Sequence, residues 1–422
     1  MTGDTTTRTA ARAAVRAAAA RALALTGTLI EQIGPRPAGS ERSRRCAEAL
    51  RGAAESTADR ARVESFTVHP GAFLGWIRVL VVIYAASVAA LWFANPLVAA
   101  LLVTAGLVVM VAEFFLYREA LDPFFPRATG WNVLASVDPV GELRGELIVS
   151  GHHDSARVFN FLIHQPRLYP VRVFGGIGSL VLLWLASWAL VVQTAVAGSP
   201  LGWTHAAAGA FTVLFLLVGQ LWWFASRRHT PGAGDNLASS AAALEALREV
   251  ADARSRGEGL DHLRVTFASW DAEECGLRGA RAWRRSQPAA AGHPVWNLNL
   301  ECLYDTRDFF LLASDINGSV PLSEALAQRC SMLLADAGYP GVPVKPIAFL
   351  TGGTDAAETA RGGAHATTLM GMPWGNTTRS AVYHTPLDTI DTVSEDALSS
   401  AVSLALALAR SIDTELAAPT RG

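Results

Sequence analysis

The most conspicuous feature of the chain is a pair of long tracts without charged side chains. The first runs from Val79 to Ala112 and the second from Val173 to Ser226, and neither contains Asp, Glu, Lys or Arg. A membrane-spanning helix needs about 20 consecutive apolar residues, so each tract is long enough for two. Turn-forming residues, Asn95-Pro96 and Gly198-Ser199-Pro200, interrupt the tracts. The pattern predicts four transmembrane helices in two hairpins, at 73–117 and 173–226.

Arginines surround both tracts and are missing from the two turns. The flanking residues are Arg78, Arg118, Arg127, Arg167, Arg172, Arg227 and Arg228. Positively charged residues near membrane helices stay on the cytoplasmic side. We therefore expect an integral membrane protein with four crossings, whose termini and polar segments face the cytoplasm.

The polar segments 1–72, 118–172 and 227–422 predict one discontinuous domain. Short apolar or alternating runs predict strands, and Ala and Leu at helical spacing predict helices. The predicted strands are 62–68, 132–137, 146–150, 262–269 and 295–300, and the predicted helices are 237–250, 323–337 and 395–416. Strands that alternate with helices indicate an α/β fold with a mostly parallel central sheet flanked by helices. The Ala- and Arg-rich segment 5–25 favours an amphipathic helix over a transit peptide.

Composition narrows the class of protein further. The 35 basic and 37 acidic residues give a net charge of −2, which argues against nucleic acid as a partner. Charged residues make up 17% of the chain, below the roughly 25% of a soluble domain, and hydrophobic residues make up 51%. The four cysteines, Cys46, Cys275, Cys302 and Cys330, form no CxxC pair, so we expect buried small hydrophobes.

Acidic and imidazole side chains come just after several of the apolar runs. They are His152 with Asp154, Asp235, Glu273 with Glu274, Glu301, and His384. In α/β sheets, ligands gather at the carboxyl ends of strands. Two histidines and three carboxylates suit a two-metal zinc site, in which one carboxylate is shared and another nearby accepts a proton from water. The adjacent Glu273 and Glu274 can divide the roles of ligand and base.

The order of these motifs resembles that of the M28 zinc aminopeptidases. The matching segments are His152-His153-Asp154-Ser155, Gly232-Ala233-Gly234-Asp235-Asn236, Glu273-Glu274-Cys275-Gly276-Leu277-Arg278-Gly279, Asn299-Leu300-Glu301 and Tyr383-His384-Thr385-Pro386-Leu387-Asp388-Thr389. Two further segments, Gly34-Pro35-Arg36-Pro37-Ala38-Gly39-Ser40 and Thr354-Asp355, are similar to the family's entry segment and its SDH segment. The resemblance covers nearly all of the polar chain.

The resemblance implies a three-layer zinc-exopeptidase fold and a peptide substrate cleaved at its N-terminus. It implies two Zn²⁺ ions, one held by His152 and Glu301 and the other by Glu274 and His384, with Asp235 between them. Cobalt or manganese also suits such ligands.

The resemblance also suggests roles for residues around the ligands. Glu273 would be the general base, and Asp154 would orient the ring of His152. Tyr383 and Asp355 are candidate substrate-binding residues. His153, between two functional positions, is expected to point to the opposite face of its strand.

The sequence departs from the family pattern at several places. Glu301 stands where many members have Asp, and Ala356 replaces the His of the SDH segment. His152 and Asp235 are 83 positions apart because the second hairpin lies between them. Both hairpins are therefore insertions within the catalytic domain, which suggests a membrane-proximal or amphipathic peptide as substrate and the lipid bilayer as a partner.

Three other functions compete with the aminopeptidase. A glutaminyl-cyclase-like acyltransferase would use the same fold with one functional zinc, but the complete ligand set favours two. A non-catalytic membrane scaffold would have no need for a base beside a ligand. A transporter is disfavoured because the tracts lack ionisable residues at mid-depth.

Overall fold

The computed structural model of the protein describes residues 2–199, 202–287, 292–375 and 381–418. The chain forms two compact units. Unit 1 comprises Met1–Val68, Arg127–Arg157 and Arg228–Gly422, and unit 2 comprises His69–Pro126 and Val158–Arg227. Unit 2 is thus made of two insertions into the chain of unit 1.

Unit 1 is built on a nine-stranded sheet. Its strands follow the order β1-β2-β6-β3-β7-β11-β8-β10, and β9 pairs with β8. The bounds are β1 (Arg60–Val68), β2 (Ala128–Val137), β3 (Gly145–His152), β6 (Leu263–Trp270), β7 (Val295–Glu301), β8 (Phe309–Asp315), β9 (Val320–Pro321), β10 (Val344–Pro346) and β11 (His365–Gly371).

The sheet is mixed, so the prediction of a mostly parallel sheet is wrong. The central pairs β3–β6, β3–β7 and β7–β11 are parallel, as is β8–β10. The pairs β1–β2, β2–β6, β8–β11 and β8–β9 are antiparallel. The pattern of apolar residues reports which strands are buried but not their direction, which depends on how each connection crosses the sheet.

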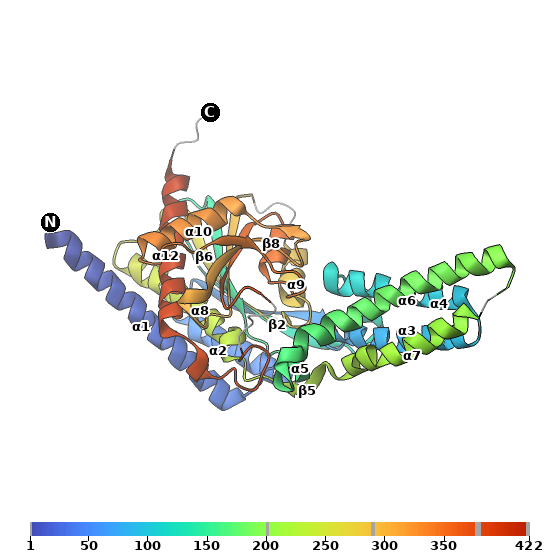
Figure 1. The fold of residues 1–422 in the computed structure, drawn as a ribbon. Coiled ribbons are helices and arrows are strands. Elements are labelled where there is room, and N and C mark those ends of the chain that lie inside the picture. The colour runs from blue at the N-terminus through green and yellow to red at the C-terminus, as the bar shows by residue number, and fades with distance from the viewer. Residues whose placement is uncertain (1, 200–201, 288–291, 376–380, 419–422) are drawn as a thin grey trace. The chain divides into compact units, whose positions relative to one another are not determined.

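Helices cover both faces of the sheet. One face packs against α1 (Thr2–Ile33), α2 (Glu41–Glu55), α8 (Ala238–Ser255), α10 (Glu324–Asp336) and α12 (Glu395–Ala417). The other carries α9 (Arg278–Ser286), which contacts α11 (Ala356–Arg361). Strand β6 contributes side chains to the hydrophobic cores on both faces of the sheet. Phe267 packs in the core beside α8 and α12, and Trp270 packs in the core beside α9. Figure 1 shows α8 and α12 in contact with α1.

The five predicted strands and three predicted helices of unit 1 are all present, with ends shifted by a few residues. The expected N-terminal helix is α1. Ala18, Ala22 and Leu29 on this helix are buried in unit 1, and Arg21 forms ion pairs with Glu245 and Glu249 of α8.

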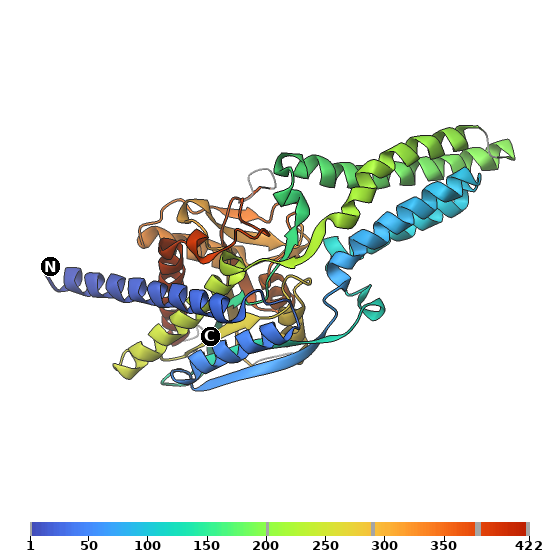
Figure 2. The same ribbon diagram turned by 90° about the horizontal axis from the view of Figure 1, so that it is seen from below.

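Unit 2 contains the four long helices of the apolar tracts. They are α3 (Ala72–Trp92), α4 (Pro96–Met110), α6 (Tyr169–Ala197) and α7 (Trp203–Gly219). Shorter elements accompany them: η1 (Val111–Phe115), η2 (Asp122–Phe124), α5 (Asn160–Ile163), η3 (Pro166–Leu168) and η4 (Gln220–Trp223). A separate two-stranded sheet pairs β4 (Arg157–Phe159) with β5 (Ala225–His229). In Figure 2, α3 lies beside α4 and α6 beside α7.

The predicted turns have a physical basis in the sequence. The Asn95 side chain accepts a hydrogen bond from the Val98 N–H, and Pro96 occupies the first turn of α4, where it needs no hydrogen-bond partner. Gly198 ends α6 with a φ of 73°, which favours glycine. Of the second predicted turn, Pro200 lies outside the described residues.

Several polar side chains in unit 2 bond to one another or to the backbone. The Tyr84 hydroxyl on α3 donates to the Phe211 carbonyl on α7, at 3.0 Å. The Thr104 hydroxyl on α4 accepts from the indoles of Trp184 and Trp188 on α6, at 3.0 and 3.2 Å. These bonds satisfy polar groups within the bundle, as a helix in an apolar solvent requires.

Among the residues that the structure describes, five helices are long and apolar enough to cross a membrane. Four belong to unit 2: Ala72–Trp92, Pro96–Phe115, Pro166–Ala197 and Trp203–Trp223. The fifth, Arg12–Ile33, is part of α1, which packs against α8 and α12 in unit 1.

Candidate metal and catalytic site

The predicted site residues meet at one edge of the sheet in unit 1. Strands β3, β6 and β7 run parallel, so their carboxyl ends lie at the same edge. His152 is the last residue of β3, Glu301 is the last of β7, and Glu273 and Glu274 follow β6. Asp235 approaches from the turn η5 (Ala233–Leu237) before α8.

Asp235 stands between the two histidines. Its Oδ1 lies 3.4 Å from Nε2 of His152, and its Oδ2 lies 3.2 Å from Nε2 of His384. His152 Nε2 is also 3.3 Å from Oε1 of Glu301, and His384 Nε2 is 3.3 Å from Oε1 of Glu274. One carboxylate therefore belongs to two groups, each containing one histidine and one glutamate.

Both groups fit a zinc ion. Ligand atoms about 2.0–2.1 Å from a tetrahedral zinc lie roughly 3.3 Å from one another. The His–Asp and His–Glu separations above match this spacing. The combinations His152–Asp235–Glu301 and Asp235–Glu274–His384 each place one ligand atom per residue within 4.8 Å of the others. A cation in each group would also offset the repulsion among the buried carboxylates.

Asp154 holds the ligand-bearing segments in place. Its Oδ1 is 3.3 Å from Nδ1 of His152, on the ring nitrogen that faces away from Asp235. Its two oxygens also accept hydrogen bonds from the N–H groups of Glu273 and Glu274, at 3.1 and 3.2 Å. The sequence predicts the contact with His152 but not the contacts with the glutamate loop.

The segment that carries Asp235 is fixed by two residues whose part the sequence does not reveal. Asp388 accepts hydrogen bonds from the N–H groups of Gly234, at 2.8 Å, and Asp235, at 3.3 Å. Asn236 donates to the Leu300 carbonyl and accepts from the Cys302 N–H, which ties the segment to the end of β7. Asp388 lies in the motif Tyr383–Thr389, and Asn236 directly follows Asp235. These positions beside predicted ligands are the only feature of the sequence that could have drawn attention to the two residues.

Burial and neighbouring charges shift the pKa values of the acidic side chains in the site. Burial raises the pKa of Glu273 well above its usual range, and the charges of Glu274 and Glu301 raise it further, although His152 lowers it. Burial raises the pKa of Glu274 to about 7. Burial also opposes the charge of Asp235, but its close contacts with His152 and His384 outweigh this and hold its pKa below the usual range.

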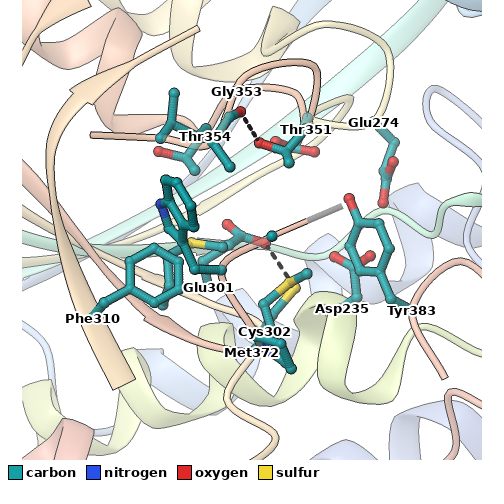
Figure 3. A pocket seen from close by; sticks show the side chains of 17 residues that line it. Asp235, Glu274, Glu301, Cys302, Phe310, Thr351, Gly353, Thr354, Met372 and Tyr383 are labelled. Carbon is teal, nitrogen blue, oxygen red and sulfur yellow. Dashed lines mark hydrogen bonds between the residues drawn. The ribbon is translucent and has the colours of Figure 1, made fainter. Parts of the chain in front are cut away.

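A pocket opens beside the candidate metal-binding residues (Figure 3). Asp235, Glu274 and Tyr383 line one end, and Phe310 lines the other, with Glu301 between them. Further apolar lining comes from Ile347, Ala348, Met370, Met372 and Trp374. The pocket therefore has a carboxylate-rich end and an apolar end.

The two candidate substrate-binding residues differ in their setting. Tyr383 lines the pocket and its ring stacks on His384, with centroids 4.0 Å apart and planes at 21°. Asp355 is fully buried beside Thr354, a pocket-lining residue. Burial and the charges of Glu301 and Asp154 raise the pKa of Asp355, although the charge of His152 lowers it.

The remaining residues near the motifs are buried. All four cysteines are buried thiols outside any disulfide, as expected, and the Cys302 thiol lies 3.7 Å from Oε1 of Glu301. His153 bonds through Nδ1 with the Ser269 hydroxyl, at 2.9 Å, and belongs to neither ligand group.

Comparisons with known proteins agree with this fold. Residues 220–409 match the sequence profile of Peptidase family M28. No curated protein matches the chain. Similar solved structures include a zinc aminopeptidase from Bacillus subtilis, BSAP, at 13% identity, covering 93% of this chain and 95% of that one, with a TM-score of 0.56.

Two further structures have comparable similarity. A Zn-dependent exopeptidase from Parabacteroides distasonis is 12% identical, covers 93% of this chain and 97% of its own, and has a TM-score of 0.54. A glutaminyl cyclase from Bacteroides thetaiotaomicron is 12% identical over 93% and 97%, with a TM-score of 0.53. The chain therefore has the predicted zinc-exopeptidase fold, and a segment of unit 1 and the adjoining end of unit 2 match Peptidase family M28.

Proposed function

We propose that this protein is a zinc-dependent aminopeptidase that uses two metal ions and is anchored in a membrane. The observation that carries the proposal is the position of Asp235, whose two oxygens face two different histidines at 3.4 and 3.2 Å. A carboxylate shared in this way is what a pair of cations about 3.5–4 Å apart requires.

In this proposal, each zinc ion has its own histidine and glutamate. His152 and Glu301 hold one ion, His384 and Glu274 hold the other, and Asp235 is shared. Bound zinc would polarise the scissile carbonyl and lower the pKa of the attacking water.

Glu273 is the proposed general base. Its Oε2 lies 3.7 Å from Nε2 of His152, so it is beside the ligand group. A carboxylate beside the metal ligands can accept a proton from water. Glu273 takes a proton from water as the oxygen attacks the carbonyl carbon, and returns that proton to the amine nitrogen as the C–N bond breaks.

The apolar end of the pocket supports a peptide substrate with an apolar first residue. Phe310, Met372 and Trp374 would surround that side chain while the scissile carbonyl lies at the carboxylate end. Tyr383, and Asp355 beside Thr354, are proposed to help bind the substrate.

We further propose that the four long helices of unit 2 lie in a lipid bilayer. Large apolar side chains on these helices are exposed, among them Val82, Leu101, Val196 and Val213. The arginines that flank the tracts favour cytoplasmic termini. A reporter fused to the C-terminus tests this orientation, and a reporter active only outside the cytoplasm would contradict it.

Metal content is the direct test of the site. Detergent-purified protein should contain close to two zinc ions per chain, and Asp235→Ala should lose both the metal and the hydrolysis of peptides with a free N-terminus. Asp252→Ala, at an exposed position of α8, serves as the control. Protein that takes up no zinc would favour a non-catalytic scaffold instead.

A glutaminyl cyclase is the second candidate, because proteins of that activity are among the structural neighbours at nearly the same TM-score. A cyclase would release ammonia from a peptide with N-terminal glutamine and leave the peptide bond intact. An aminopeptidase would release the free amino acid. Product analysis on one such peptide therefore separates the two.

A further inference from the structure

Arg36 is a fully buried arginine in the connection between α1 and α2. Burial disfavours its charge and lowers its pKa, while the charges of Asp388 and Asp154 support the cationic form. Within the described ranges, no carboxylate forms an ion pair with it. Its donors are used on backbone carbonyl groups instead.

The guanidinium group joins two segments that are distant in the sequence. Nε donates to the His153 carbonyl at 2.6 Å. Nη1 donates to the carbonyl of Pro231 at 3.0 Å and to that of Gly34 at 3.1 Å, and Nη2 donates to the Gly232 carbonyl at 2.7 Å. One side chain thus contacts the residue after His152 and the residues just before Asp235.

The backbone of Arg36 strengthens the same connection. Its N–H donates to the Ser155 hydroxyl at 3.0 Å, and its carbonyl accepts from the Ser155 N–H at 2.9 Å. Gly232 has a φ of +65°, and a Cβ there would lie 2.7 Å from Nη2 of Arg36 and 2.8 Å from the Ser155 hydroxyl. The close approach of the two segments therefore requires glycine at this position.

The chain between these two segments contains the long insertion Val158–Arg227. The two ends of this insertion are held together by the pairing of β4 with β5, and the Thr230 N–H donates to the Ala156 carbonyl at 2.9 Å. A metal site needs its ligands held to within about 0.5 Å. Arg36 adds a connection closer to the two candidate ligands, because its side chain bonds to residue 153 and to residues 231–232.

We propose that Arg36 is a further positioning residue of the metal site, which helps to fix the His152 segment against the Asp235 segment. The proposal rests on the proposed function, since it takes His152 and Asp235 to be ligands. Arg36 touches neither substrate nor metal in this role. Its effect passes through the backbone of residues 153–155 and 231–232.

The test compares Arg36→Lys with Arg281→Lys in the detergent-purified full chain. Lysine keeps the positive charge at position 36 but cannot donate hydrogen bonds to all four carbonyl groups that the guanidinium group contacts. Arg281 is another buried arginine, on α9, and is paired with Glu358 at 2.8 Å. Metal-free samples are titrated with Co²⁺ alone, and affinity, the visible absorption spectrum of bound Co²⁺ and the melting temperature of the metal-free protein are recorded.

We expect Arg36→Lys to weaken Co²⁺ binding roughly 10–100-fold and to alter the absorption spectrum. Arg281→Lys should lower the melting temperature and leave both metal readouts as in the wild type. Wild-type affinity and spectrum in Arg36→Lys would overturn the proposal while leaving the proposed function intact. A wild-type protein that binds no Co²⁺ would overturn both.

If the Arg36→Lys protein does not fold, the variant Ser155→Ala provides a second test of the proposal. It removes only the acceptor of the Arg36 N–H and should weaken Co²⁺ binding several-fold, with a spectral change in the same direction. A folded Ser155→Ala protein with unchanged affinity and spectrum would overturn the proposal.

Discussion

Units 1 and 2 place their apolar side chains in opposite ways. In unit 1 the apolar residues of the sheet and helices form a continuous buried core, and charges concentrate at one edge of the sheet. In unit 2 the helices keep a buried seam, while apolar side chains such as Val82 and Val213 are 55% and 66% exposed. The two units therefore differ in where their apolar side chains lie, which is in the interior in unit 1 and largely also on the surface in unit 2.

The largest effect is expected at the proposed base in unit 1. Glu273→Gln removes the proton acceptor but keeps the shape of the side chain, so kcat should fall about 10²–10⁴-fold. Zinc content should remain at the wild-type level, whereas Glu274→Gln should lose metal. Peptide hydrolysis and metal analysis of the two variants provide the measurement, and a Glu273→Gln protein with full activity would contradict the assignment.

The buried ion pairs of unit 1 predict a pH-dependent stability. Glu358 on α11 is bonded to Arg281 and Arg284 of α9. Burial opposes the charge of Glu358, but the arginines outweigh burial and lower its pKa below the ordinary 4.5. Glu358→Gln leaves buried arginine donors with a weaker partner, so the free energy of unfolding at neutral pH should fall by about 3–5 kcal/mol.

The sign of the pH effect follows from that lowered pKa. The stabilisation from Glu358 is complete above about pH 4.5 and is lost as the pH falls through the folded-state pKa. The difference in stability between wild type and Glu358→Gln should therefore shrink below pH 4.5. Glu31→Gln, at an exposed position of α1, should give no such dependence. A constant difference down to pH 3 would refute the argument.

A single charge tests whether the exposed apolar surface of unit 2 faces lipid. Val213→Arg, near the middle of α7, should cost roughly 2.5–3.5 kcal/mol on membrane insertion. Val140→Arg, at a 61% exposed position of unit 1, should change almost nothing. Membrane-fraction yield of the two variants is the readout. Equal yields would indicate that the exposed surface of unit 2 contacts water, as that of unit 1 does, and would contradict its exposure to lipid.

The smallest expected effect concerns packing within unit 2. Thr104→Val removes the acceptor shared by the indoles of Trp184 and Trp188 and should destabilise the bundle by roughly 0.6–1.7 kcal/mol. Ser87→Ala removes only a bond within α3, to the Ile83 carbonyl, and should have a smaller effect. Unfolding in mixed detergent micelles measures both, and the reverse ranking would contradict the proposed role of Thr104.

Local patterns were enough to predict the strands that carry His152 and Glu301, and to select the residues that come together at the sheet edge. This worked because each ligand lies next to an apolar run whose period is visible in the sequence. The direction of β2, β8 and β9 was not predictable from the same patterns, since strand direction is decided by connections and pairing rather than by side-chain alternation.

The contacts that hold the site were harder to foresee. Arg36 and Asp388 both lie in recognisable motifs, but they act on backbone carbonyl and N–H groups. Such groups occur at every position, so the sequence does not mark which of them a buried charge will meet. Only the folded arrangement identifies the Gly232 carbonyl and the Gly234 N–H as partners.

The discontinuity of unit 1 has a consequence for biosynthesis. β3 is complete at His152, but both of its neighbours in the sheet, β6 and β7, emerge more than a hundred residues later, after the whole of the second insertion. At about 5–20 residues per second, β3 waits on the order of ten seconds for its first partner strand. During that interval an apolar strand with two open edges must be kept from pairing with other chains, so the nascent protein is expected to need a chaperone before its sheet can close.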